Sequence, residues 1–203
     1  MSLDRLRDDE LAAVVTYLEM RAPPAGAAIP PSPLRLDPRR TCTPDAYRTL
    51  FHLVGARWLW FSRLVMRDGD LAAILDDPAV ELFAVLDPEG RDVGMLELDF
   101  RQTGACELAF VGLVPTLAGH GHGRWLLAEA IDRAWRPGIS RVHVHTCSLD
   151  HPAALSAYRR AGFAPIRRAV ERFADPRLAG ILPPDCAPQV ALLGAPTSPA
   201  RCA

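Results

Sequence analysis

The chain has 203 residues, of which 49% are apolar, and its formal net charge is −1. This composition is typical of a soluble globular protein with one main domain that needs no disulfide or metal to fold, and the near-zero charge argues against nucleic acid as a partner. All 23 basic residues are arginine, so the mechanisms of P-loop NTPases, pyridoxal phosphate enzymes and protein kinases, which need a lysine, are excluded.

The first predicted element is a strand over Ala13–Met20, which is rich in apolar and β-branched residues. A proline-rich extended crossing is expected over Arg21–Thr43. Thr43 and Pro44 then indicate the start of a helix. Its apolar face repeats at helical spacing, with Tyr47, Leu50, Phe51 and Val54. A second helical stretch is expected over about Trp58–Met66.

The middle of the chain predicts three consecutive antiparallel strands joined by turns, over Val80–Leu86, Val93–Phe100 and Cys106–Val114. Alternation along the second strand places Leu96, Leu98 and Phe100 on one face and Glu97 and Asp99 on the other. Along the third strand, one face is expected to hold Glu107, Ala109, Val111 and Leu113. The remaining pattern predicts a helix over Trp125–Trp135, a strand over Arg141–Cys147, a helix over Pro152–Ala161 and a strand over Ala164–Phe173.

The loop between the third of these strands and the next helix contains Gly119, Gly121 and Gly123. Glycines allow a tight turn that aims several amide groups at one point, where the positive end of the helix dipole also lies. A pyrophosphate is the natural ligand of such a cradle. Dinucleotide-binding folds use similar loops, but they need repeated βαβ units, whereas three antiparallel strands precede this loop.

At this point the sequence resembles the GNAT superfamily of acyl-CoA-dependent N-acetyltransferases. The residues that match its two motifs are Pro115, Gly121, Gly123, Ala154, Tyr158, Gly162 and Phe163. Ala118 departs from the usual Arg or Gln, and His151 stands where Asn is common. The resemblance covers residues 80–173 well and residues 1–79 only by the order of the elements.

The resemblance implies an α/β (α+β) fold with a mixed, mostly antiparallel twisted sheet flanked by helices on both faces. It implies a single domain over residues 1–173, with an acyl-CoA-binding core over about 80–173. The Pro-rich segment 174–203 is expected to be a peripheral or flexible tail. The implied activity is transfer of acetyl from acetyl-CoA to a primary amine of a small-molecule or peptide acceptor, without a metal.

The resemblance also assigns roles to residues. Tyr158 is the expected general acid and Glu107 the expected base, because partial burial would raise the pKa of Glu107 toward neutrality. Glu97 and Asp99 are the alternatives for the base. A backbone N–H near Leu113 would polarise the thioester carbonyl, where the neighbouring strand splays away. Contacts to coenzyme A are expected from Leu113, Val114, Gly119, His120, Gly121, His122, Gly123, Arg124 and His151.

The histidines, cysteines and tryptophans allow other interpretations. A zinc site from His143, His145 and Cys147 is disfavoured, because residues two apart on a strand lie about 6.5–7 Å from one another. An acyl carrier at Cys106 or Cys147 is disfavoured because apolar strand surroundings raise the pKa of a thiol. Whether Trp58 or Trp60 lines the acceptor pocket or packs in the core stays open.

The five cysteines (42, 106, 147, 186 and 202) form no CxxC motif, and an odd number argues against a disulfide scaffold. The first ten residues are strongly charged, which predicts no secretory signal, and no apolar run approaches about 18 residues. We therefore expect a cytoplasmic protein with no membrane partner, and a homodimer is left open. Two alternatives to amine acetylation remain: a coenzyme A-binding sensor or assembly module without turnover, and transfer of a longer acyl group or transfer to oxygen.

Overall fold

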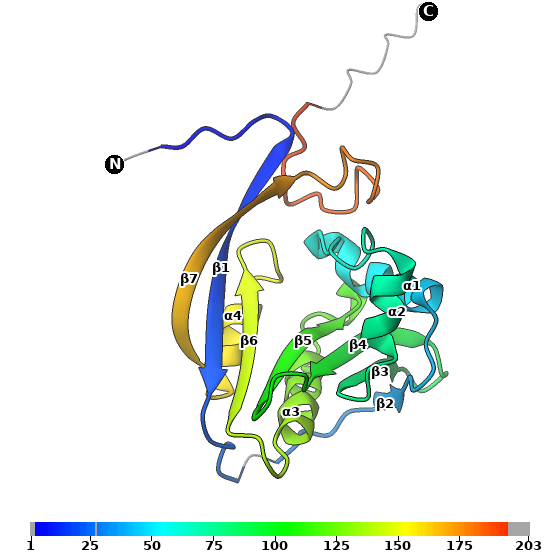
Figure 1. Cartoon of the computed structure of the whole chain (residues 1–203), viewed down its shortest axis with the longest axis vertical. Coiled ribbons are helices and arrows are strands. Elements are labelled where there is room, and N and C mark those ends of the chain that lie inside the picture. Colours follow the sequence, from blue (N-terminus) through cyan, green and yellow to red (C-terminus); the bar gives the residue numbers. More distant parts are fainter. Residues whose placement is uncertain (1–2, 27, 195–203) are drawn as a thin grey trace, which may run out of the picture.

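The computed structural model describes residues 3–26 and 28–194. They form a seven-stranded sheet in the order β2-β3-β4-β5-β6-β1-β7 (Figure 1). Neighbouring strands are antiparallel except for the parallel pair β5 and β6, so the predicted mixed, mostly antiparallel sheet is confirmed. The strands are β1 (Glu10–Met20), β2 (Arg35–Pro38), β3 (Val80–Leu86), β4 (Asp92–Asp99), β5 (Ala105–Leu113), β6 (Arg141–Cys147) and β7 (Ala164–Ala174).

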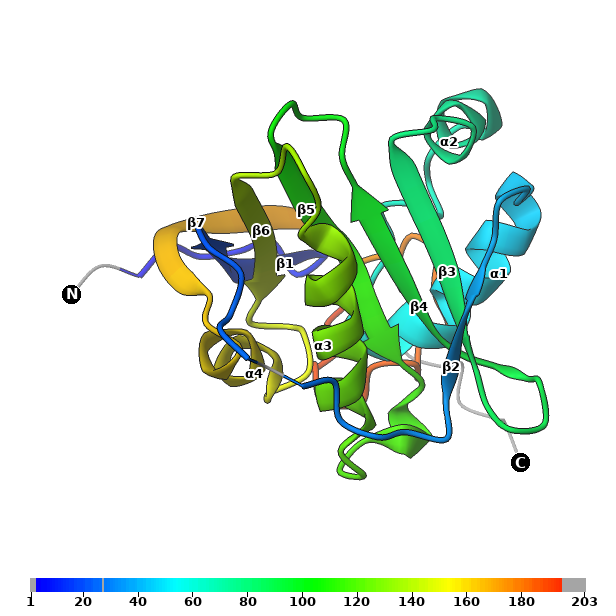
Figure 2. The ribbon, with the colours of Figure 1, turned by 90° about the horizontal axis from the view of Figure 1, so that it is seen from below.

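Helices cover both faces of the sheet, as predicted (Figure 2). On one face α1 (Pro44–Gly55) packs on β4 and β5, and α2 (Asp68–Leu75) packs on α1 and β3. On the other face α3 (His122–Ala134) and α4 (Ala154–Arg160) bury an apolar core against the sheet. Thr43 caps α1, because its hydroxyl accepts a hydrogen bond from the Ala46 amide.

The predicted helix over Trp58–Met66 is wrong. The chain after α1 forms only a single 3-10 turn, η1 (Ala56–Trp58), and Leu59 then adopts a left-handed backbone conformation with a φ of 57°. A residue with positive φ cannot continue a right-handed helix. The real second helix on this face is α2, where Asp68 and Asp70 in the first turn favour a helix start. The short strand β2 lies in the stretch expected to be an extended crossing.

The predicted faces of β5 also need a correction, because Ala109 is a β-bulge. Leu98 of β4 pairs with Leu108, but the next residue, Glu97, pairs with Phe110, so Ala109 has no partner. An extra residue in one strand reverses the alternation of side chains beyond it. Phe110 therefore shares the face of Glu107 beneath α1, while Val111 and Leu113 turn to the opposite core beneath α3.

The same bulge lies where β5 separates from β6. Pairing between these two parallel strands is limited to the positions from Ala105 with Arg141 to Glu107 with His143. A bulged strand bends and twists more strongly. Beyond Glu107 the two strands diverge toward their C-terminal ends, as Figure 1 shows.

The expected C-terminal tail is folded over its first part. Residues 175–194 leave β7 and return to η1, where Leu182 and Ala187 bury Leu59 and the Gln189 amide donates to the Arg57 carbonyl at 2.6 Å. A buried ion pair between Asp175 and Arg177 holds this segment. Arg177 also donates to carbonyl oxygens of residues 187, 190 and 191. Residues 195–203 of the expected tail lie outside the described residues.

Arg177→Ala should strongly destabilise the fold. It leaves the Asp175 carboxylate, whose side chain is 3% exposed, buried without its partner. Loss of one partner of a buried pair costs about 3 kcal/mol or more. Urea unfolding would measure this. Arg67→Ala, which removes the solvent-exposed pair with Asp70, is the control and should cost no more than about 0.5 kcal/mol. Equal losses in the two variants would contradict a bracing role for the 175–194 segment.

Candidate functional site

A cleft lies where β5 and β6 diverge. It is lined by both strands, by the glycine loop at the start of α3, by α4 and by the segment Trp58–Arg63. Seven of the nine residues predicted to bind coenzyme A line this cleft: Leu113, Val114, Gly119, Gly121, Gly123, Arg124 and His151. His120 and His122 are not part of its lining.

The glycine loop presents a run of unused backbone donors. Among the described residues, the amides of residues 119–123 donate to no acceptor, whereas the Ala118 and Arg124 amides on either side are both bonded. Gly119 and Gly121 have φ values of 81° and 82°, which side chains rarely allow. A Cβ built on Gly119, Gly121 or Gly123 would meet no atom within 4 Å, so the space in front of the loop is open. Free amides at a helix N-terminus favour an anion.

A second set of unused backbone groups lies on β5. The Val114 amide donates to the Val93 carbonyl at 2.9 Å, which makes residues 93 and 114 a hydrogen-bonded pair. Pairs alternate in an antiparallel ladder, so the next pair, Gly94 with Leu113, is not hydrogen-bonded. By the same alternation the peptide groups of Leu113 and Val111 point away from β4 and toward the gap before β6. The Leu113 amide is thus free, whereas the Val114 amide is occupied.

The two loop histidines and His151 have local partners. The His122 ring nitrogen Nδ1 lies 3.2 Å from the Ser32 hydroxyl, which ties the loop to the segment before β2. The His120 and His122 rings are 6.3 Å apart. His151 accepts a hydrogen bond from the Ala153 amide at 3.1 Å, and its ring meets the Trp58 ring edge-on at 5.1 Å.

Tyr158 lies on α4 and lines the cleft. Its ring packs edge-on against Phe163 at 5.9 Å, and its hydroxyl has no hydrogen-bond partner among the described residues. Burial raises the pKa of Tyr158 above its ordinary value. The phenol therefore keeps its proton at neutral pH, as a proton donor must.

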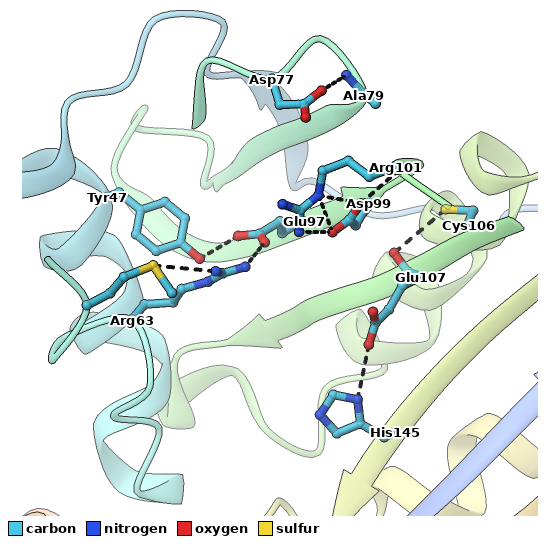
Figure 3. Close-up of polar contacts among 11 residues, drawn as sticks. Tyr47, Arg63, Asp77, Ala79, Glu97, Asp99, Arg101, Cys106, Glu107 and His145 are labelled. Carbon is cyan, nitrogen blue, oxygen red and sulfur yellow. Dashed lines mark hydrogen bonds and ion pairs between the residues drawn. The ribbon is translucent and has the colours of Figure 1, made fainter. Parts of the chain in front are cut away.

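Glu107 forms a pair with His145 across the gap (Figure 3). The Nδ1 atom of His145 lies 3.1 Å from a carboxylate oxygen of Glu107, and both side chains line the cleft. This hydrogen bond holds the pKa of Glu107 below its ordinary value and raises the pKa of His145. The expectation that burial raises the pKa of Glu107 toward neutrality is therefore wrong, because the imidazole stabilises the carboxylate more than burial destabilises it.

The two alternative carboxylates are bound to arginines. Glu97 is fully buried, accepts a short hydrogen bond from the Tyr47 hydroxyl and pairs with Arg63 at 2.6 Å (Figure 3). It does not line the cleft. Asp99 does line it, but hydrogen bonds from Arg101 outweigh the effect of burial and keep the pKa of Asp99 low.

Asp150 connects the end of β6 to the segment Trp58–Arg63, and no sequence motif singled it out. One of its carboxylate oxygens accepts from the Thr146 hydroxyl at 2.7 Å and the Cys147 amide at 2.8 Å. The other accepts from the Trp60 indole N–H at 3.1 Å. The Trp60 ring lies over Gly112, where a Cβ would come within 3.1 Å of it. Both Trp58 and Trp60 line the cleft, and Trp60 also packs on Phe51 and Phe110. An acidic residue after β6 was the only signal for Asp150 in the sequence.

The histidines and cysteines of the sheet are the residues that bear on metal and thiol chemistry. Within residues 3–26 and 28–194, no three His, Cys, Asp or Glu side chains are grouped to hold a metal ion. Burial raises the pKa of the Cys106 thiol to about 12 and that of Cys147 to about 11, so thiolates are scarce at neutral pH. No helix of the described chain is long and apolar enough to cross a membrane.

Comparisons with known proteins agree with this geometry. The model of the acetyltransferase (GNAT) family matches residues 47–163, more than half of the chain. A GCN5-related N-acetyltransferase from Sphaerobacter thermophilus is 20% identical, with a TM-score of 0.55, over 80% of this chain and 51% of that one. A GCN5-related N-acetyltransferase from Kribbella flavida is 18% identical, with a TM-score of 0.50, over 81% and 60%. A tandem GNAT protein from the clavulanic acid biosynthesis pathway is 16% identical, with a TM-score of 0.55, over 81% and 53%.

At these identities the solved structures establish the fold. The chain spans between half and two thirds of the length of these three proteins. No curated protein matches the chain.

Asp150→Ala should loosen the contact between Trp60 and the turn after β6. Three donors lose their acceptor, a net hydrogen bond to a charged group contributes about 1.5–3 kcal/mol, and water can take over part of this role in the open cleft. We expect the free energy of unfolding, measured by urea titration, to fall by about 3 kcal/mol. Asp132→Ala, at an exposed residue that also lines the cleft, is the control. A loss no larger than that of the control would show that Asp150 does not hold the two segments together.

Proposed function

The chain belongs to the acetyltransferase (GNAT) family, and from this premise we propose that it transfers an acetyl group from acetyl-CoA to a primary amine by direct attack. The observation that carries the proposal is the combination of free amides at residues 119–123 with the unpaired peptide groups of Val111 and Leu113 in one cleft. These are donors for a pyrophosphate and for a thioester carbonyl, which acetyl-CoA contains in one molecule.

Binding would use the cleft from the glycine loop to the gap between β5 and β6. The amides of residues 119–123 and the N-terminus of α3 would hold the pyrophosphate, and Arg124 lines the same part of the cleft. The free peptide groups on β5 would hold the extended arm by strand-like hydrogen bonds. His151, with its Nδ1 bonded to the Ala153 amide, leaves only its other ring nitrogen for a ligand.

Acetyl-CoA supplies an activated thioester. The free amide of Leu113 or Val111 would stabilise the negative charge that develops on the carbonyl oxygen. The Glu107–His145 pair takes the proton of the acceptor's ammonium form, directly or through a water molecule. The free amine nitrogen then bonds to the carbonyl carbon, and its second proton leaves to water. The carbon–sulfur bond breaks, and the Tyr158 hydroxyl gives its proton to the departing sulfur. The products are an amide and coenzyme A with a free thiol.

The acceptor would enter from the side of Trp58, Trp60 and Asp150. A small-molecule or peptide amine fits this assignment. The runner-up function is a coenzyme A-binding sensor or assembly module without turnover, since Ala118 lacks the usual loop side chain. The presence of Tyr158 and the Glu107–His145 pair in the same cleft favours the enzyme.

The proposal is tested by mixing the protein, acetyl-CoA and a panel of primary amines and measuring the release of free thiol. We expect release that depends on both the protein and the amine, with a matching mass increase of the amine. Calorimetric binding of acetyl-CoA without thiol release with any amine would favour the sensor. No binding at millimolar acetyl-CoA would overturn both functions. Propionyl-CoA and an alcohol panel in the same assay distinguish longer acyl groups and oxygen acceptors.

Gly121→Val should weaken acetyl-CoA binding by at least about 10-fold. A β-branched residue cannot keep a φ of 82°, so the amides around it would turn away from their common point. The conformational cost of about 1–2 kcal/mol corresponds to roughly this factor. Gly90→Val is the matched control, because Gly90 has the same φ of 82°, its Cβ would meet no atom within 4 Å, and it does not line the cleft. Unchanged affinity of Gly121→Val in calorimetry would contradict the assignment of the loop.

Tyr158→Phe should lower turnover by about 10²-fold while acetyl-CoA binding stays within twofold. The ring keeps its packing against Phe163, and the hydroxyl has no partner within the described structure whose loss would disturb the fold. Steady-state thiol release and calorimetry together measure the two effects. Normal turnover would remove Tyr158 as the acid, and a parallel loss of binding would assign it a structural role instead.

A further inference from the structure

The Glu107–His145 pair leaves one ring nitrogen unused in the cleft. A carboxylate only accepts hydrogen bonds, so the Nδ1 atom of His145 carries the proton in its 3.1 Å contact with Glu107. Neutral His145 then has its lone pair on Nε2. Nε2 makes no hydrogen bond with any residue of the described structure, and the side chain is 49% exposed. The pair therefore presents a free imidazole lone pair to the cleft.

The sheet fixes the direction of this imidazole. His145 lies opposite Tyr17 in the β1–β6 ladder, and the two ring centres are 5.9 Å apart. The Arg167 guanidinium lies over the Tyr17 ring at 4.0 Å, which connects β7 to the same arrangement. His145 is thus held by a hydrogen bond from β5 and a ring contact from β1.

The charges around His145 make it a stronger base than a free imidazole, whereas they make Glu107 a weaker base than a free carboxylate. Glu107 and the more distant Asp150 and Glu171 raise the pKa of His145, whereas the His145 hydrogen bond lowers the pKa of Glu107. Burial lowers the pKa of the neighbouring His143. The charged or titratable groups that face the pair are His143 and Asp150 from β6 and its following turn, Asp99 from β4, Glu171 and Arg167 from β7, and Tyr17 from β1.

We propose that Nε2 of His145 is the atom that takes the proton from the acceptor amine, directly or through one water, and that Glu107 is a positioning residue. Glu107 holds the Nδ1–H tautomer and stabilises the imidazolium that forms. Nε2 takes the proton of the ammonium form before attack, which frees the nitrogen lone pair. The second N–H proton leaves to water as the carbon–nitrogen bond forms, and His145 returns its own proton to water after the amide leaves. This inference rests on the proposed function and names the proton acceptor within it.

Two acceptor amines of equal size can distinguish loss of the base from damage to the rest of the site. Hydroxylamine and methylamine have the same number of heavy atoms, but hydroxylamine is unprotonated at pH 7 and methylamine is almost wholly protonated. Transfer to hydroxylamine therefore needs the acetyl-CoA site and Tyr158 but little help from a base. Transfer to methylamine needs a group that removes the proton.

We expect His145→Gln to lower transfer to methylamine by about 10²-fold and transfer to hydroxylamine by no more than a few-fold, after subtraction of the uncatalysed rate. Glu107→Gln keeps an oxygen for Nδ1–H but loses the charge, so the loss with methylamine should be smaller than that of His145→Gln. His52→Gln, at an exposed histidine of α1 that does not line the cleft, is the control and should leave both rates unchanged.

The pH profile gives a second readout. Wild-type transfer to methylamine should rise with pH through the pKa of His145, because only the neutral imidazole accepts a proton. Glu107 stabilises the imidazolium, so Glu107→Gln should lower this pKa and move the rising limb to lower pH. Nitrogen NMR of the His145 ring should show the Nδ1–H tautomer in the wild type and the same downward pKa shift in Glu107→Gln.

The outcomes distinguish failure of the proposed function from failure of the assignment of His145 as the base. A wild-type protein that releases no thiol with either amine overturns the proposed function, and this inference with it. A wild type that is active with both amines, together with an equally active His145→Gln, overturns the inference alone. A greater loss with Glu107→Gln than with His145→Gln, or an Nε2–H tautomer in the spectrum, would return the role of base to the carboxylate.

Discussion

Ala109 sits unpaired between two pairs of the β4–β5 ladder. Because of this one extra residue, β5 bends just beyond Glu107, the last of its residues to pair with β6. The bulge also reverses which side chains face which core, so Phe110 joins Glu107 on the α1 face while Val111 and Leu113 pack toward α3. Without the bulge, β5 and β6 could pair along their length, and the peptide groups of Val111 and Leu113 would form hydrogen bonds with β6.

The gap that the bulge opens has different chemistry at its two ends. Toward α3, the donors are backbone amides that glycine conformations and a helix start keep free of partners. On the opposite side, the groups are side chains: the Glu107–His145 pair and Asp150 with its bound Trp60. Backbone donors cannot titrate, whereas imidazole can exchange a proton near neutral pH. The arrangement thus separates backbone donors with a fixed partial charge from side chains that can titrate.

The Trp58–Arg63 side of the cleft depends on the C-terminal segment. Residues 175–194 bury Leu59, whose left-handed backbone lies between Trp58 and Trp60, and Gln189 holds the Arg57 carbonyl. A non-glycine residue with positive φ persists only where its surroundings compensate for the strain. The buried Asp175–Arg177 pair and the apolar contacts of Leu182 and Ala187 supply this support. A segment that composition alone marked as a tail therefore shapes the mouth of the cleft.

Local patterns determined most of the fold. Alternating strands, the Thr43 cap, and the spaced glycines predicted the sheet, α1 and the start of the site, because each depends on neighbours in the sequence. Local patterns gave a wrong prediction at residues 58–66, because the backbone conformation of Leu59 depends on contacts with the C-terminal segment. They also could not predict the bulge at Ala109, because it exists only where β4 and β5 pair.

The candidate site also has features that follow from the sequence and features that follow only from the tertiary structure. From the sequence alone came the two motifs that contain the glycine loop and Tyr158, and Glu107 as a candidate base beside Glu97 and Asp99. Only the tertiary structure decided that Glu107 meets His145, 38 residues further along the chain, and that its pKa falls instead of rising. A pKa depends on the charges within a few ångströms, and those neighbours are set by how strands pair and diverge.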